Sequence, residues 1–114
     1  MRVIAVDKII NMMMNSGESF VFLYKRARPK CKNCGHLAKE YEGEICSECK
    51  GSIKKYRTAV GKFDSESKIE KGKKGKLLVY YDIEKNEHRR CYIENIVYAK
   101  IKEEMLFAEN IKIE

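Results

Sequence analysis

The chain has 114 residues, 44% hydrophobic and 36% charged, and its formal net charge is +7. This length supports one hydrophobic core, and this composition is typical of a folded domain rather than a disordered chain. It contains no run of 18 apolar residues, and its first 24 residues lack a signal-peptide pattern, which argues against membrane-spanning and secreted proteins. We therefore expect one domain over residues 1–114 in the cytoplasm, or in the host cytoplasm if the protein is viral. The abundance of Lys, Glu and Ile without any Gln is typical of thermophiles, although an AT-rich genome produces the same bias.

The first part of the chain allows two structures. Residues 2–10 and 18–28 are rich in β-branched and aromatic residues, and residues 15–18 (NSGE) between them have the composition of a turn, so we favour a β-hairpin. Alternatively, Asp7 caps a short helix that ends at Gly17. The apolar face of that helix would consist of Ile9, Ile10 and Met13.

The rest of the chain also favours strands. Residues 53–63 form a strand candidate, and residues 64–76 have the Gly, Lys and Ser content of a loop. A second hairpin is predicted from residues 76–83 and 89–101, turning through residues 84–87. The tail from 102 to 114 is predicted to be a helical turn or an edge strand. The expected fold is mostly β (or α+β): a small sheet or barrel, formed by residues 1–28 and 53–114, with residues 29–52 inserted.

Two Cys-x2-Cys pairs lie in that insertion, eleven residues apart. The pairs are Cys31 with Cys34 and Cys46 with Cys49. Two intervening residues let both sulfurs of a pair converge on one ion, and four thiolates satisfy tetrahedral zinc without leaving a position for substrate. We therefore predict one structural Zn²⁺ rather than two disulfides, free thiols or a redox dithiol. His36 is expected near the site without binding the metal, and Cys91 is expected to be a buried, free cysteine.

Residues 31–35 (CKNCG) and 46–51 (CSECKG) resemble the zinc-ribbon superfamily. The resemblance covers residues 29–52, about 24 of the 114, and implies a two-armed zinc module of the kind found in transcription factors, polymerase subunits, ribosomal proteins and interaction adaptors. The second loop departs from the usual pattern because its glycine, Gly51, comes one position late.

Positive charge is concentrated on both sides of the cysteines. Residues 25–34 and residues 50–57 contain nine Lys or Arg and no acid. One bound metal would bring these stretches together, and their mutual repulsion would be offset by phosphates. A third basic run, residues 68–76, resembles a mobile loop. The predicted nucleic-acid contacts are Lys25, Arg26, Arg28, Lys30, Lys32, Lys54, Lys55, Arg57, Lys73 and Lys74.

The predicted function is therefore binding of DNA or RNA through phosphate contacts, with transcription as the candidate process and with Tyr24 and Tyr56 available to stack on bases. The alternative is a protein-interaction adaptor whose contact residues would be the acidic Glu40, Glu42 and Glu44. No phosphate-binding glycine loop is present, since residues 72–76 (GKKGK) lack the required spacing and hydroxyl. We predict that the protein is not an enzyme, with a nuclease as the remaining possibility.

Overall fold

The computed structural model describes residues 2–27, 29–31, 33–37 and 45–109, and these residues form a mostly β domain with one α-helix. This confirms the predicted fold class. The helix is α1 (Val6–Asn15), and a 3₁₀ turn, η1, covers Ile93–Asn95. The strands are β1 (Arg2–Ile4), β2 (Phe20–Lys25), β3 (Tyr56–Lys62), β4 (Lys68–Gly72), β5 (Gly75–Asp82), β6 (Glu87–Tyr92), β7 (Ile96–Ile101) and β8 (Glu104–Ala108).

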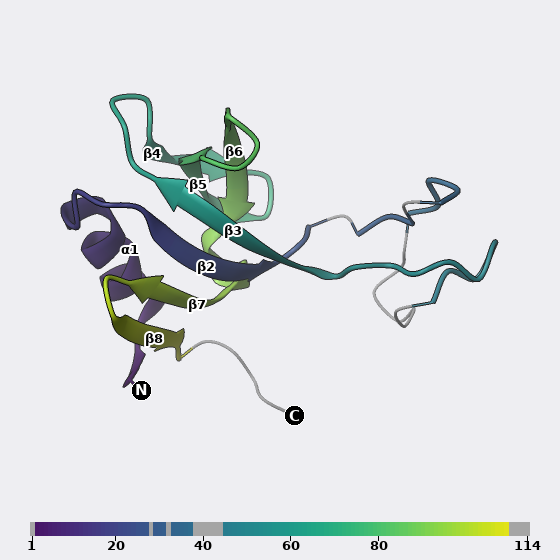
Figure 1. Ribbon diagram of the computed structural model, residues 1–114, viewed down its shortest axis with the longest axis horizontal. Coiled ribbons are helices and arrows are strands. Elements are labelled where there is room, and N and C mark those ends of the chain that lie inside the picture. The colour runs from purple at the N-terminus through teal and green to yellow at the C-terminus, as the bar shows by residue number, and fades with distance from the viewer. Residues whose placement is uncertain (1, 28, 32, 38–44, 110–114) are drawn as a thin grey trace.

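The strands form one sheet that curls into an open half-barrel (Figure 1). Their order is β1-β8-β7-β2-β3-β5-β4, and β6 also pairs with β5. The β1–β8 pair is parallel, whereas the other pairs are antiparallel. Alternate residues of the central strands point into the curl, because successive side chains of a strand lie on opposite faces of a sheet. The main core therefore contains Phe20, Phe22, Ala59, Tyr80, Ala99 and Leu106.

The expected first hairpin is wrong: residues 6–15 form helix α1. Its buried side chains, Ile9, Ile10 and Met13, are those of the alternative helical interpretation. Their spacing places them on one helical face, which packs in the core beneath β7 and β8. Asp7 lies in the first turn, and Ala5 occupies the N-cap without a side-chain cap. Within the described part of the chain, no helix is long and apolar enough to cross a membrane.

The region from 64 to 76 is not one loop, because it contains strand β4. β4 pairs with β5 through a hairpin whose turn consists of Lys73 and Lys74, since Gly72 is the partner of Gly75. The second predicted hairpin is confirmed as β5 and β6, but its second arm ends at η1. The chain then continues as β7, which pairs with β2 and β8. The tail contains strand β8, which lies between β1 and β7.

A buried cluster of polar side chains connects β2, β3 and β5. The Arg57 guanidinium forms an ion pair with the carboxylate of Asp82, whose side chain is 0% exposed, and Asp82 also accepts the Lys85 backbone N–H at 3.0 Å. Beside this pair, the hydroxyls of Tyr24 and Tyr80 lie 3.0 Å apart. Burial raises the pKa of Tyr80 above its ordinary value, so its hydroxyl stays protonated. These residues fix the base of the segment that follows β2.

That segment, the β2–β3 connection (residues 26–55), projects away from the sheet on the side opposite α1 (Figure 1). It leaves and re-enters through neighbouring antiparallel strands, because Lys25 of β2 is the partner of Tyr56 of β3. The pairing continues beyond the strands: Arg26 N–H donates to Lys55 O at 2.7 Å, and Cys31 forms an isolated bridge with Ile53. The cysteines thus lie at the end of two paired stretches, residues 25–31 and 53–56, which we call the stem.

Candidate metal centre

The first cysteine loop places Cys31 and Cys34 on one turn of backbone. Gly35 N–H donates to Cys31 O at 2.9 Å, and Cys31 N–H donates to His36 O at 2.8 Å, which closes the loop at both ends. Gly35 has a φ of 78°, in the left-handed region that glycine adopts without steric cost. The position of this glycine directly after Cys34 is therefore explained by the backbone.

The second loop has the same hydrogen-bond pattern with a different residue at the left-handed position. Lys50 N–H donates to Cys46 O at 3.0 Å, and Cys46 N–H donates to Gly51 O at 2.7 Å. Lys50 has a φ of 64° and so occupies the position that corresponds to Gly35. The left-handed conformation costs a non-glycine residue roughly 1–2 kcal/mol of conformational free energy.

Gly51 follows Lys50 at a position where a side chain would be tightly packed. A Cβ at this position would lie 3.2 Å from the sulfur of Cys31, 3.2 Å from that of Cys49 and 3.2 Å from the Cβ of Asn33. Such contacts are tighter than ordinary van der Waals separation. Close packing around the sulfurs therefore favours glycine at position 51.

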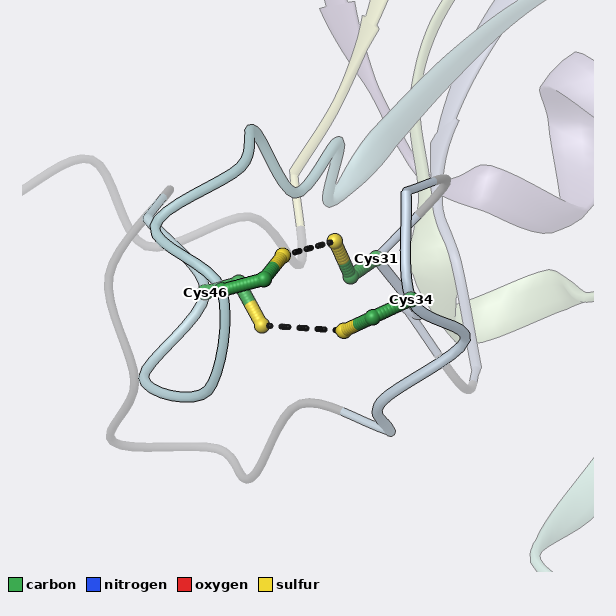
Figure 2. A group of neighbouring side chains, drawn as sticks. Cys31, Cys34 and Cys46 are labelled. Atoms are coloured by element: carbon green, nitrogen blue, oxygen red, sulfur yellow. Dashed lines mark hydrogen bonds between the residues drawn. The ribbon is translucent and has the colours of Figure 1, made fainter.

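The two loops bring four sulfurs to one point. The ligand atoms of Cys31, Cys34, Cys46 and Cys49 all lie within 4.8 Å of one another. The Cys31 and Cys49 sulfurs are 3.5 Å apart, and those of Cys34 and Cys46 are 3.6 Å apart. Figure 2 shows the labelled sulfurs directed at a common centre. Zn–S bonds of about 2.3 Å in a tetrahedron require sulfurs roughly 3.8 Å apart, so this geometry is compatible with one zinc ion.

The surroundings of the sulfurs differ. Cys31 and Cys46 are buried and pack with Ile53, whereas Cys34 is exposed. Cys49 accepts hydrogen bonds from the Asn33 amide and from Gly51 N–H, both at 3.4 Å, and these lower its pKa to about 6. At Cys34 a backbone hydrogen bond from His36 acts in the same direction, but the neighbouring thiols raise its pKa to about 12. Of these two cysteines, Cys49 is therefore the one that more readily offers a thiolate to a cation.

Asn33 is expected to strengthen metal binding although it is not a ligand. Its amide is directed at the Cys49 sulfur from the opposite loop, so it both stabilises negative charge and fixes that ligand. Replacing Asn33 with Ala should lower zinc affinity by about tenfold or more. Competition with a chromophoric chelator measures this loss. Ser52→Ala, an exposed change in the same segment, is the control, and equal affinities of the two variants would contradict this role.

His36 and the fifth cysteine, Cys91, lie outside the group, as expected. The His36 Nε2 atom lies 3.4 Å from Ser47 Oγ, and the sulfur cluster contains the four cysteines alone among the described residues. Cys91 is 4% exposed in the β core, where burial raises its pKa to about 12. A thiol held protonated in this way packs as a small apolar side chain.

The predicted cationic residues do not all share one environment. Lys25, Lys30 and Lys54 are exposed on the stem, while Arg26 and Lys55 are half-buried there. Arg28 and Lys32 lie outside the described residues, as do the acidic Glu40, Glu42 and Glu44. Lys73 and Lys74 are exposed at the β4–β5 turn. The stem thus brings two basic stretches side by side, and the third basic stretch lies on a different part of the fold.

Two residues proposed as nucleic-acid contacts belong to the core. Arg57 is 11% exposed and paired with Asp82, and Tyr24 is 6% exposed with its hydroxyl on Tyr80. Neither side chain is available to a phosphate or a base, because both point into the curl of the sheet. The basic-stretch pattern could not separate Arg57 from its exposed neighbours, since the partner carboxylate lies 25 residues further along the chain.

Sequence reasoning missed Asn33 and the packing role of Gly51. The only available signal for Asn33 was its place between Cys31 and Cys34, where many residue types are compatible with the loop. In comparisons with protein-family models, curated proteins and solved structures, nothing matches this chain. The functional assignment therefore depends on the chain's own geometry: four convergent thiols, compatible with one zinc ion, at the end of a basic stem.

Proposed function

We propose that this chain is a zinc-ribbon protein that binds nucleic acid through phosphate contacts made by the stem of the β2–β3 connection. The zinc is structural, because four cysteine ligands leave no coordination position for water or substrate. The ion holds the two loops together and keeps the flanking basic stretches adjacent. Neither stretch contributes an acid that could neutralise its neighbour.

The observation that carries the proposal is the antiparallel pairing of these stretches. Lys25 lies opposite Tyr56, and Arg26 is hydrogen-bonded to Lys55, so cations from both stretches occupy one short stem. Like charges held together in this way repel one another, and an anionic polymer relieves the repulsion. Nucleic acid is such a polymer, and its binding releases counterions, which makes the affinity salt-dependent.

Neutralising two stem lysines should flatten the salt dependence of binding. With Lys25 and Lys54 both changed to Ala, the slope of log K against log salt should fall in magnitude by roughly 1.4–1.8, because each lost phosphate contact removes about 0.7–0.9. Fluorescence anisotropy with labelled oligonucleotides across a salt series measures the slope.

The control changes Lys8 and Lys85 to Ala, which removes the same charge from exposed positions on α1 and on the β5–β6 turn. It should leave the slope close to that of the parent protein. Equal slopes for the two double variants, or no binding to any nucleic acid at low salt, would contradict the proposal.

A protein-interaction adaptor is the second candidate, and two exposed apolar side chains favour it. Leu37 is 55% exposed just after the first cysteine loop, and Ile45 is 66% exposed just before the second. Their position at the outer end of the stem suits contact with a protein partner better than contact with phosphates. Under this alternative, changing both to Ser abolishes partner binding, whereas the lysine variants retain it.

A further inference from the structure

The outer face of the half-barrel is not covered by any described element. Helix α1 and strands β4 to β6 lie on or across the concave side, where the buried side chains of the central strands point. On the other side, β1, β8, β7, β2 and β3 present the alternate residues of each strand, which are half-buried or exposed. We call this surface the open face.

Aromatic side chains cross the open face in register. Phe107 of β8 is the partner of Tyr98 of β7, and their ring centroids lie 5.6 Å apart. Tyr98 is in turn the partner of Leu23, which lies opposite Thr58 on β3. Tyr56, two residues before Thr58 on the same face, is 50% exposed. Tyr56 and Tyr98 are therefore separated by two strand spacings and one two-residue step, about 12 Å.

The charges on the open face are all positive. Lys25, Lys62 and Lys100 are exposed on the outward side of β2, β3 and β7, and Lys25 lies directly opposite Tyr56. In these five strands the only acidic residue is Glu104. It lies on the concave side of β8, the same side as Leu106. An acid-free surface that carries both flat rings and ammonium groups is complementary to a ligand with anionic groups and flat, unpaired faces.

We propose that the open face binds single-stranded nucleic acid, with bases stacked on Tyr98 and Tyr56 and phosphates beside Lys25 and Lys100. The inference rests on the proposed function and specifies its ligand: a duplex keeps its bases stacked inside, so it cannot reach these rings. The separation of the two tyrosines suits two different nucleotides of an extended strand. Tyr56 joins this surface to the basic stem, which makes one continuous binding path.

The test compares a labelled oligothymidine, a labelled oligouridine and a labelled hairpin duplex by anisotropy. Tyr98→Leu and Tyr56→Leu should each weaken single-strand binding by roughly 5- to 150-fold, the range for loss of one stacked base. Tyr98→Phe and Tyr56→Phe keep the ring and should bind within about twofold of the parent protein. The two labelled single strands show whether DNA or RNA is preferred. Zinc content and thermal unfolding establish that each variant is folded.

The outcomes distinguish failure of this inference from failure of the proposed function. If the lysine variants of the stem lose binding but the Leu variants do not, the open face is not the stacking surface, and the proposed function stands. Tighter binding of the duplex than of either single strand likewise overturns the inference alone. If no nucleic acid binds at low salt, both fail. If sedimentation shows a dimer that Tyr98→Leu dissociates, the occupant of this face is a second copy of the chain.

Discussion

Replacing Cys46 with Ser is expected to remove zinc from the protein and to disorder the end of the β2–β3 connection. Cys46 is fully buried and its sulfur lies 3.6 Å from that of Cys34, so serine would leave a three-thiolate set around the ion. Structural zinc contributes roughly 10–16 kcal/mol of binding free energy to small domains, far more than the contacts of Ile53 with the cysteines can replace. Metal analysis of the purified protein measures the loss.

Cys91→Ser is the matched control, because it makes the same chemical change at the cysteine outside the cluster. It should retain one zinc per chain while lowering the stability of the β core. The sheet itself should survive the loss of zinc, since its core contains none of the four ligands. A Cys46→Ser protein with full zinc content, or a parent protein without zinc, would contradict the assignment of the metal centre.

Changing Asp82 to Ala should destabilise the fold by about 3–5 kcal/mol, the usual consequence of removing one partner from a buried ion pair. The Arg57 guanidinium, 11% exposed, would remain charged between β3 and β5 without its carboxylate. The Lys85 N–H would also lose its acceptor at the end of β5. Urea denaturation of the zinc-loaded protein measures the difference.

The double variant Arg57→Met with Asp82→Leu tests the cause of that loss. It removes both charges together and should recover most of the stability, because buried ion pairs are often replaceable by apolar residues of similar volume. If Asp82→Ala costs less than about 1 kcal/mol, or if the double variant is as unstable as the single, the pair is not the buried interaction inferred here.

The cysteine site was predictable from sequence because its chemistry depends on local spacing. Two residues between cysteines and eleven between pairs were enough to predict the convergence of Cys31, Cys34, Cys46 and Cys49. The reason for Gly51 was not predictable, because two of the three atoms nearest to its Cβ position, from Cys31 and Asn33, belong to the other loop. Long-range packing of this kind leaves no pattern in a single sequence.

The fold was less predictable where local preference and tertiary packing compete. The β-branched residues before position 11 favoured a strand, yet the spacing of Ile9, Ile10 and Met13 suits a helix that covers β7 and β8. Strand β4 was missed because it is an edge strand with a mostly polar sequence, whose lysines discourage pairing with other chains. Arg57 was misassigned because its partner, Asp82, becomes a neighbour only when β3 pairs with β5.

The attachment of the β2–β3 connection has a consequence for the modularity of the protein. The connection is flanked by the cross-strand partners Lys25 and Tyr56, and the Cα atoms of such a pair are about 5 Å apart. A tight turn of a few residues spans the same gap, so the hairpin can be closed without moving either strand. The entropic cost of closing a loop rises only slowly with its length. A longer insertion at this point therefore lowers the stability of the sheet only slightly. We therefore expect that the cysteine-bearing segment can be shortened or replaced by a tight turn while the half-barrel keeps its register.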